Sequence, residues 1–298
     1  MSREEWTFER VAGSFGFTEG PVWDGSGIIF SDLEASTIRR YDRESETAEV
    51  VAEGTNGGNG LKFGPDGRLY VCESEAHRVC RYELDGTRTV VADEFGGTPL
   101  NAPNDLAVDG AGDVWFSDPN YGDEERPLAH RSVYRVDPAD PDDLQRVTED
   151  TTQPNGLLVS PDGGTLYVAQ SDYRADEPTE LRAYPIRPDG TLGAYEVLHN
   201  FHPHRGIDGM CFTAGGDIVA AAGWPQSGPG AMLYVFEPSG RVRSTHPFPE
   251  RGGKPTNCAF GGPDRSILYV TCSEGLLFRA RTRLTGLRDA PDTPRLPW

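Results

Sequence analysis

Six polar residues stand immediately before short apolar runs that recur along the 298-residue chain. They are Glu19, Asn59, Asn104, Asn155, Asp208 and Asn257, at intervals of 40, 45, 51, 53 and 49 residues. Any one Asn-Gly or Asp-Gly pair could simply mark a turn. The turns inside the repeats lie elsewhere, however, for example at Asp66-Gly67 and Asp162-Gly163. The six residues therefore share one phase of a repeat, and their side chains should occupy equivalent places.

The types of these six residues indicate a site for a divalent cation. Glu19 and Asp208 supply carboxylates and the other four supply amide oxygens, while no Cys or His occurs at this phase. Hard oxygen donors suit Ca²⁺, or Mg²⁺ and Mn²⁺, whereas zinc sites usually contain His or Cys. We expect one cation, with Ca²⁺ as the first candidate and Mg²⁺, Mn²⁺ or Zn²⁺ as the others. The alternative is that backbone amides bind each carboxylate without a metal, although buried unpaired charge is costly.

The repeats predict how these residues are brought together. In the second repeat, turns separate four β-rich runs, GLKF, RLYVC, RVCRYEL and TRTVVA. Four short strands joined by hairpins form a propeller blade, and no segment has the sustained 3.6-residue period of a helix. We therefore predict an all-β fold, a six-bladed β-propeller with four-stranded blades, as a single domain over residues 1–298. The first strand of each blade would line the axis, so the six polar residues would meet at one mouth of the channel.

The sixth repeat lacks a fourth strand of its own. It runs out after ILYVTC and GLLFRARTR, whereas the segment TFERVAG at residues 7–13 precedes the first repeat in the same phase as TAEVVAE at 47–53. We expect this N-terminal strand to complete the last blade. Closure of this kind leaves no free sheet edge at the seam of the ring.

Three long segments follow the second strand of their blades and would form the rim of the pocket. They span residues 117–132, 169–180 and 221–231. They carry Tyr121, Tyr173 and Trp224, which could stack on a sugar face or pack the loops against one another.

A histidine-rich stretch, NFHPHRGIDGM, leads into Asp208 on the same face. We take His204 as a candidate for a substrate contact, with a solvated loop histidine as the alternative. Arg205 could receive a carboxylate or a hydroxyl group of the ligand.

The composition limits the partners of the protein. A formal net charge of −19 opposes binding to nucleic-acid phosphates and to anionic membranes. The chain has no run of 18 apolar residues and no signal-peptide pattern, so we expect a cytoplasmic protein. The five cysteines show no paired CxxC spacing and are expected to be buried thiols. We expect a monomer or a weak homo-oligomer that acts on a small molecule.

The motifs together resemble one family, that of gluconolactonase, regucalcin (senescence marker protein) and the luciferin-regenerating enzyme. The resemblance covers essentially the whole chain and is carried by TEGPVW, NAPNDLAVD…GDVWFSDPNYG, QPNGLLVSPDG, IDGMCF and TNCAFGG. It implies a single divalent cation in the channel, held by Glu19, Asn104, Asn155 and Asp208. Asn59 and Asn257 match no family ligand, so we place them around the ligands or against the substrate, with a plain turn role as the alternative.

The resemblance implies a metal-dependent lactonase of carbohydrate metabolism. In this reading the cation polarises a sugar-lactone carbonyl, Glu19 holds the cation, and Asp208 takes the proton of the attacking water. The sequence has no GxSxG motif with a partner histidine, so a covalent acyl-enzyme has little support. Hydrolysis of organophosphates or aryl esters at the same metal site is an alternative, and so is a calcium-binding regulatory propeller without turnover.

One position departs from the family pattern. Regucalcin-type members carry, two residues before the third-blade Asn, an Arg that contacts a sugar lactone, whereas Ala102 stands there in this chain. The stretch DPNYG resembles the bacterial gluconolactonases instead. A lactone is therefore expected as substrate, and the particular sugar is left open.

Overall fold

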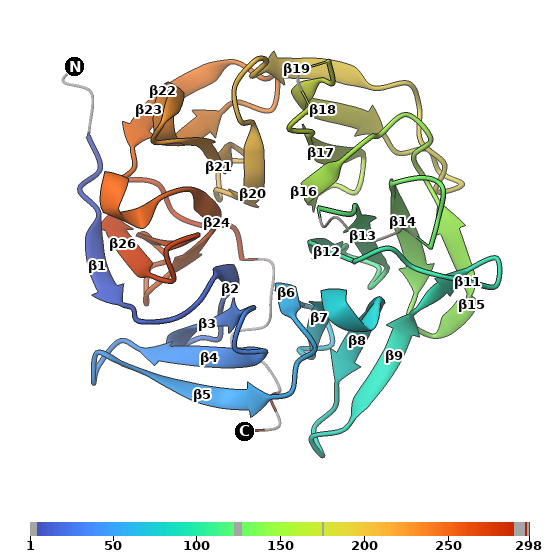
Figure 1. Cartoon of the computed structure of the whole chain (residues 1–298), viewed down its shortest axis with the longest axis horizontal. Helices are drawn as coiled ribbons and strands as arrows, with labels where there is room; N and C mark the ends of the chain where they lie inside the picture. Colours follow the sequence, from blue (N-terminus) through green and yellow to red (C-terminus); the bar gives the residue numbers. More distant parts are fainter. Residues whose placement is uncertain (1–4, 122–126, 175, 289–295, 297) are drawn as a thin grey trace.

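The chain folds into six four-stranded antiparallel sheets arranged as blades around a central axis (Figure 1). The structure is a computed structural model, and it describes residues 5–121, 127–174, 176–288, 296 and 298. The predicted all-β, six-bladed propeller with four-stranded blades is confirmed.

The strands keep the same order in every blade, from the axis outward. The innermost strands are β2 (Thr18–Trp23), β6 (Gly58–Phe63), β12 (Leu106–Val108), β16 (Pro154–Val159), β20 (Ile207–Phe212) and β24 (Pro255–Gly261). The second strands are β3 (Gly27–Asp32), β7 (Leu69–Glu73), β13 (Val114–Asp118), β17 (Thr165–Ser171), β21 (Ile218–Trp224) and β25 (Ile267–Cys272). The third strands are β4 (Thr37–Asp42), β8 (Arg78–Tyr82), β14 (Ser132–Asp137), β18 (Thr179–Pro185), β22 (Ser227–Phe236) and β26 (Leu277–Arg281). The outermost strands are β5 (Thr47–Glu53), β9 (Arg88–Ala92), β15 (Asp140–Arg146), β19 (Glu196–Asn200), β23 (Val242–Pro247) and, in the last blade, β1 (Glu9–Ala12).

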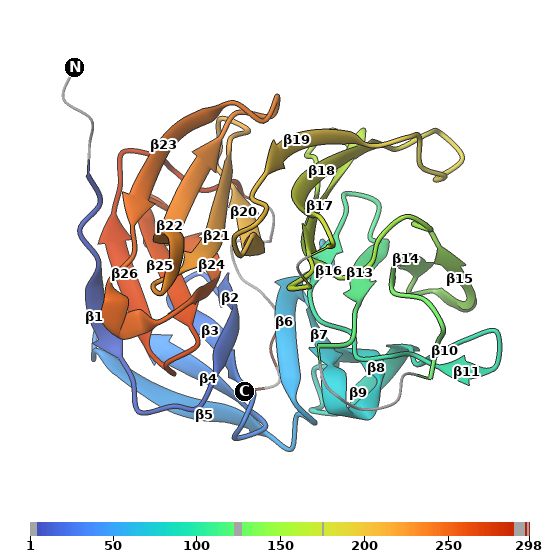
Figure 2. The same ribbon diagram turned by 45° about the horizontal axis from the view of Figure 1, so that its top comes forward.

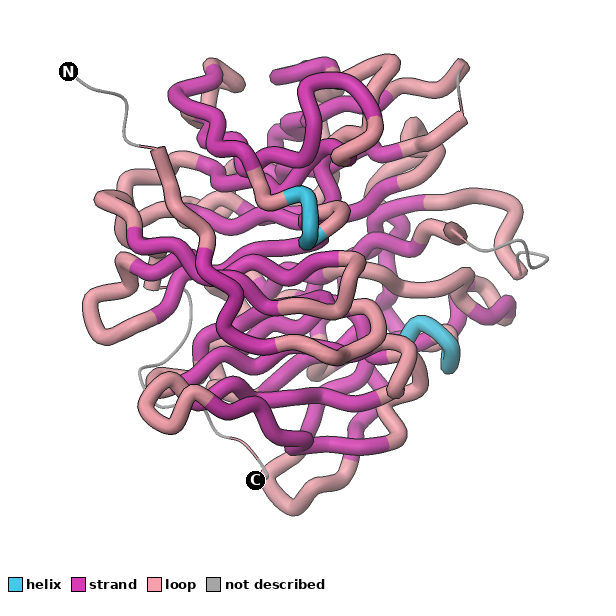
Figure 3. Tube along the Cα trace, turned by 60° about the vertical axis from the view of Figure 1, so that its left-hand side comes forward, coloured by secondary structure: helices cyan, strands magenta, loops and turns pink. Residues whose placement is uncertain are grey.

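Among the residues that the structure describes, helical structure is confined to two short 3₁₀ turns, η1 (Ser74–Ala76) and η2 (Glu250–Gly252) (Figure 3). An extra two-stranded hairpin, β10 (Glu94–Phe95) and β11 (Thr98–Pro99), leads into the third blade. No helix in the described part of the chain is long and apolar enough to cross a membrane.

The hydrophobic core is divided among the gaps between blades. Buried apolar side chains form six clusters, and each cluster joins two neighbouring blades. Strand β3 shows how one strand serves two of them, because Ile28 and Phe30 pack toward the last blade while Ile29 packs toward the second. Alternate residues of a strand point to opposite faces, and both faces are buried here. The middle strands of a blade therefore read as continuous apolar runs.

The N-terminal strand closes the ring, as the sequence predicted. Strand β1 pairs antiparallel with β26, with Glu9 opposite Arg279 and Arg10 opposite Phe278. Figure 2 shows β1 lying along the outside of the last blade, beside β26. Just before β1, Trp6 stacks on His246 of β23 with ring centres 3.8 Å apart, so the N-terminal segment also covers part of the fifth blade.

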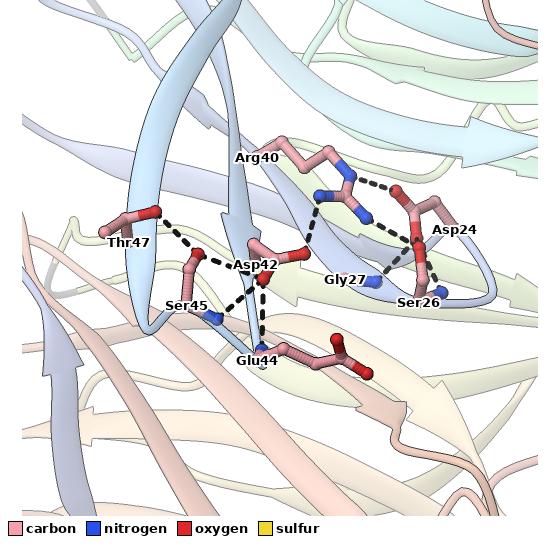
Figure 4. Close-up of polar contacts among 8 residues, drawn as sticks. All are labelled: Asp24, Ser26, Gly27, Arg40, Asp42, Glu44, Ser45 and Thr47. Carbon is pink, nitrogen blue, oxygen red and sulfur yellow. Dashed lines mark hydrogen bonds and ion pairs between the residues drawn. The ribbon is translucent and has the colours of Figure 1, made fainter.

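Aspartates organise two hairpin turns of the first blade. In the first blade, Asp24 Oδ1 accepts hydrogen bonds from the backbone N–H groups of Ser26 and Gly27 at 2.8 and 2.6 Å (Figure 4). Arg40 joins this turn to the next, since its Nε donates to Asp24 at 2.6 Å and its Nη1 to Asp42 at 3.2 Å. Hydrogen bonds from Ser45 and Arg40 lower the pKa of Asp42 to about 2. These acidic residues therefore have a local structural use and need no ligand.

The five cysteines are free and buried, as expected from their spacing.

Candidate active site

A distortion of the inner strands aims the repeated polar residues at the axis. Five of the six inner strands lose regular register with the second strand at this point. The breaks fall between Glu19 and Val22, Gly58 and Leu61, Pro154 and Leu157, Ile207 and Met210, and Pro255 and Cys258. A β-bulge bends a strand and redirects its side chains. In these five blades, the polar residue that recurs in the sequence therefore coincides with an irregularity of the inner strand.

The glycine after the polar residue allows neighbouring inner strands to touch. A methyl group built on Gly20 would lie 2.5 Å from the carbonyl oxygen of Asn59, and one on Gly156 would lie 2.3 Å from that of Asp208. A methyl group on Gly60 would likewise meet the carbonyl oxygen of Asn104 at 2.9 Å, whereas one on Gly209 would meet the side chain of Asn257 at 2.0 Å. These Glu-Gly, Asn-Gly and Asp-Gly pairs are therefore close contacts between blades rather than turns.

A cavity of about 270 Å³ opens at this mouth of the channel, and we call it the ligand cavity. It brings together most of the residues proposed from the sequence. These are Glu19, Asn59, Asn104, Tyr121, Asn155, Tyr173 and Asp208. Arg205 and Lys254 complete its polar wall.

The third blade presents Asn104 from a loop rather than from a strand. Asn104 lies two residues before β12, and its backbone N–H donates to the carbonyl of Ser117 at 2.9 Å. The buried carboxylate of Asp118 accepts hydrogen bonds from the backbone N–H groups of Asn101 and Ala102 at 2.9 and 2.8 Å. Burial raises the pKa of Asp118 to about 7. The role of Asp118 is to fix the segment that carries Asn104.

Asn257 lies next to the ligand cavity and binds two carboxylates. Its Nδ2 donates to Glu19 at 3.2 Å and to Asp105 at 3.3 Å, while its Oδ1 accepts from the backbone N–H of Cys258 at 2.8 Å. Asn257 and Asp105 line a narrower cavity of about 50 Å³, further along the axis. The structure thus gives Asn257 carboxylates as neighbours, and the substrate contact stays a prediction.

The buried carboxylate of Glu19 lies close to two other carboxylates, those of Asp208 and Asp105. Its Oε2 accepts hydrogen bonds from Gly20 N–H at 2.6 Å and from Asn257. Burial raises the pKa of Glu19 well above its usual range, and the negative charges of Asp208 and Asp105 raise it further. Three buried carboxylates in one place would gain from a positive charge among them.

Asp208 has a cationic partner within the protein. Arg205 Nη2 is hydrogen-bonded to Asp208 Oδ2, and Arg205 Nη1 donates to the carbonyls of Gly223 and Pro255 at 2.8 and 3.3 Å. Burial raises the pKa of Asp208, and the positive charge of Arg205 acts in the opposite direction. Arg205 also fixes the direction in which the carboxylate of Asp208 points.

The remaining rim residues line a second, adjoining cavity of about 410 Å³, which we call the side pocket. His204 and Trp224 line the side pocket but not the ligand cavity, whereas Tyr173 lines both. Tyr121 and Tyr173 contact each other with ring centres 5.7 Å apart, so the loops of the third and fourth blades meet over the site. Of the predicted rim loops, residues 122–126 and 175 lie outside the described residues.

A cation in the ligand cavity would need amide oxygens among its ligands as well as carboxylates. Within the described ranges, no group of three or more His, Cys, Asp and Glu side chains could hold a metal on its own. Glu19 and Asp208 supply two carboxylates, and Asn104 and Asn155 supply amide oxygens in the same cavity. An oxygen-only set of this kind fits Ca²⁺ better than Zn²⁺.

The sequence analysis missed Asp105 and Lys254. Asp105 is buried, and burial raises its pKa to about 6. One signal was available, because the third repeat places Asp105 where four others place glycine after the polar residue. Lys254 is one of only two lysines in the chain, but this scarcity alone predicted no function for it.

Comparison with known proteins shows one consistent family. The family described as SMP-30/gluconolactonase/LRE-like region matches residues 17–274. A gluconolactonase of Zymomonas mobilis is 31% identical, covering 93% of this chain and 82% of its own. The pentonolactonase XacC of Haloferax volcanii is 27% identical, over 86% of this chain and 81% of its own. The structure of a gluconolactonase from Xanthomonas campestris superposes with a TM-score of 0.79 at 30% identity, covering 93% of this chain and 90% of that one.

Proposed function

This chain belongs to the SMP-30/gluconolactonase/LRE-like family, and from that premise we propose that it is a divalent-metal-dependent hydrolase of sugar lactones. The observation that carries the proposal is the convergence of four oxygen donors from four blades on one cavity. The donors are Glu19, Asn104, Asn155 and Asp208.

Burial and charge support a cation at these donors. The carboxylates of Glu19 and Asp208 are 6% and 8% exposed. Burial raises the pKa of Glu19, and repulsion by Asp208 and Asp105 raises it further. A divalent cation would offset this repulsion and keep both carboxylates ionised. Ca²⁺ suits the donors best, with Mg²⁺, Mn²⁺ or Zn²⁺ as further candidates. When bound, the cation would polarise the lactone carbonyl and lower the barrier to attack by water.

Asp208 is the residue we propose as the general base. It lies in the wall of the ligand cavity, and burial moves its pKa upward, which makes a carboxylate a stronger base. Arg205 holds one carboxylate oxygen by a hydrogen bond, which fixes the orientation of the carboxylate of Asp208. Glu19, bound by Gly20 and Asn257, has the role of a fixed ligand.

The size and walls of the site favour a small sugar lactone. The ligand cavity of about 270 Å³ lies just below the roughly 300–1,000 Å³ of pockets that hold drug-sized ligands. Tyr121 and Tyr173, 38% and 57% exposed, offer ring faces to a sugar at its entrance. The relatives named gluconolactonase and pentonolactonase support a five- or six-membered aldonolactone.

The proposal is tested by a substrate panel assayed with and without chelator. Five- and six-membered aldonolactones, aryl esters and phosphotriesters are compared at equal concentration. We expect the aldonolactones to be hydrolysed fastest, with activity lost in chelator and restored by Ca²⁺ or another divalent cation. Faster turnover of phosphotriesters or aryl esters would show that the protein is an organophosphate or aryl-ester hydrolase rather than a lactonase. Stoichiometric calcium binding without any turnover would identify a regulatory propeller.

A further inference from the structure

Both lysines of the chain lie at the central axis. The sequence contains 28 lysine and arginine residues, of which only Lys62 and Lys254 are lysines. Lys62 lines the narrow cavity beside Asp105, and Lys254 lines both the ligand cavity and the side pocket. A lysine presents a compact ammonium group with three donors, unlike the planar fork of arginine. At Lys254 this ammonium group stands where the two cavities join.

The side pocket continues the ligand cavity away from the proposed metal ligands. The two cavities share Tyr173, Arg205 and Lys254 as walls, but none of the four proposed ligands lines the side pocket. Its wall also includes Trp224, which is 42% exposed and does not line the ligand cavity. A sugar with its reacting carbonyl at Asp208 would therefore extend its other end between Tyr173 and Trp224.

The side pocket is positively charged on a strongly negative protein. Asp172 is its only carboxylate-bearing wall residue among those described, and Arg174 Nη2 neutralises it at 2.7 Å. Arg205 is held by Asp208, although its buried Nε has no hydrogen-bond partner in the described part of the chain. The formal charge of the whole chain is −19. The wall of the side pocket thus holds three cationic side chains, Arg174, Arg205 and Lys254, and one carboxylate, Asp172. Arg174 and Arg205 are also paired with Glu177 and Asp208, which lie outside that wall.

Lys254 adds a positive charge to the wall that the two cavities share. Its Nζ lies 5.9 Å from the ring centre of Trp224, and its positive charge also acts on Asp208, whose pKa it lowers. The backbone of Lys254 is fixed by a hydrogen bond from its N–H to Ser273 Oγ at 3.0 Å. Cation–π contact with an exposed ring is weak compared with an ionic hydrogen bond. An anionic group in the side pocket would gain a direct partner.

We infer that the side pocket is a subsite for an anionic substituent carried by the sugar at the end opposite its lactone carbonyl, with Lys254 as the ionic partner. The inference rests on the proposed lactone hydrolysis for the orientation of the sugar. The substituent could be a phosphate or a carboxylate, since either accepts hydrogen bonds from an ammonium group.

Binding of unreactive sugars tests the subsite without turnover. Calorimetry on the calcium-loaded protein compares D-glucose, D-glucose 6-phosphate, D-glucuronate and inorganic phosphate. We expect at least one anionic sugar to bind about 10-fold or more tightly than glucose, as a hydrogen bond to a charged group provides. Lys254→Met should bring the ratio of the two affinities, anionic sugar over glucose, to within about 2-fold of unity. Lys254→Arg should retain part of the preference for the anionic sugar.

A matched control separates a local contact from general charge. Arg251 lies three residues before Lys254, on η2, and lines neither cavity. Arg251→Gln removes one positive charge and should leave the ratio of affinities unchanged. An equal fall of the ratio in both variants would overturn the subsite, and so would inorganic phosphate binding as tightly as glucose 6-phosphate.

Kinetics then distinguish failure of the subsite from failure of the proposed function. If the wild type hydrolyses D-glucono-1,5-lactone but binds no anionic sugar better than glucose, the subsite is wrong and the lactonase proposal stands. If no lactone is hydrolysed, the proposed function is wrong, and the affinity ratios still decide whether the pocket binds anionic sugars. With both correct, Lys254→Met should raise KM for the 6-phosphorylated lactone about 10-fold more than for the neutral lactone.

Discussion

Glu19 and Asp208 are buried carboxylates with different partners. Glu19 is surrounded by neutral hydrogen-bond donors and by two other carboxylates, whereas Asp208 is paired with Arg205. This difference fits the two roles proposed for them, a ligand that needs a cation and a base that is already oriented. The residue types and their phase could be read from the sequence. The partners could not, because Asn257 and Arg205 reach these carboxylates only through the folded ring.

Replacing either carboxylate by its amide should weaken metal binding and abolish most of the activity. Glu19→Gln and Asp208→Asn each remove one of the two charges that would balance the cation. We expect the metal affinity to fall by more than about 100-fold, since changes around metal ligands already cost about 10–100-fold. Calcium calorimetry and lactone turnover measure the two effects.

The exposed Glu44 offers a matched control for these variants. Glu44→Gln makes the same change of group at a hairpin turn of the first blade. It should leave both metal binding and turnover as in the wild type. A folded Glu19→Gln protein with wild-type activity would show that Glu19 is not a ligand.

His246 should make the stability of the protein sensitive to acid. Burial lowers its pKa to about 4, while Trp6 stacks on its ring and Ser244 contacts Nε2 at 2.9 Å. A depressed histidine pKa means that the folded state favours the neutral ring. Its contribution is therefore fully present above about pH 6.5 and is lost as the pH falls toward 4, by an amount on the order of a few kcal/mol.

Thermal unfolding between pH 7.5 and 4.5 checks the effect of His246. We expect the melting temperature of the wild type to fall more steeply with acid than that of His246→Phe, which keeps an aromatic ring against Trp6. Parallel curves for the two proteins would show that the burial of His246 does not contribute to the acid sensitivity.

At the scale of elements, the inner strands decide where the site residues lie. Their bulges and close contacts set the positions of Asn59, Asn155 and Asp208 around the axis. The sequence predicted the strands because both faces of the middle strands are buried, which leaves short continuous apolar runs. It did not reveal the bulges, since register depends on pairing between strands. For the same reason, Asp105 was overlooked beside Asn104.

Gly156 should be indispensable to the geometry of the site. A methyl group at this position would meet backbone atoms of the fifth blade, the carbonyl oxygen of Asp208 at 2.3 Å and Gly209 Cα at 2.8 Å. Backbone cannot rotate away as a side chain can, so Gly156→Ala should cost about 1–3 kcal/mol or more. It should also weaken metal binding by displacing Asp208.

Gly110 provides the comparison for this substitution. A methyl group on Gly110 would meet no atom within 4 Å, and its backbone does not require glycine. Gly110→Ala should change the free energy of unfolding by less than about 0.5 kcal/mol. Chemical denaturation measures the free energy of unfolding of both variants. Equal stabilities would show that Gly156 is not required for the close contact between the fourth and fifth blades.

At the scale of the whole molecule, the ring is closed by segments from opposite ends of the chain. Each inner strand contacts the inner strands of both neighbouring blades, and β1 pairs with β26 at the seam (Figure 1). The repeat phase was sufficient to predict this closure. The particular lactone could not be predicted, because the residues proposed to contact it, Tyr173, Trp224 and Lys254, come together only when separate blades assemble.

Deletion of residues 1–13 should destabilise the entire ring. It removes β1, which completes the last blade, and the buried Trp6 and Phe8, which pack between the fifth and sixth blades. The exposed edge of β26 would also favour aggregation. We expect one cooperative thermal transition at a clearly lower temperature. A melting curve equal to that of the intact chain would disprove closure by this strand.

The central claim is that one divalent cation at Glu19, Asn104, Asn155 and Asp208 makes this protein a lactonase. The most direct test titrates Ca²⁺ into chelator-treated protein and measures, in the same samples, calorimetric occupancy and the hydrolysis of D-glucono-1,5-lactone. The account predicts one site per chain, a rate that rises in proportion to its occupancy, and neither binding nor turnover in Glu19→Gln. Full turnover in excess chelator, with the absence of metal verified by elemental analysis, would contradict it.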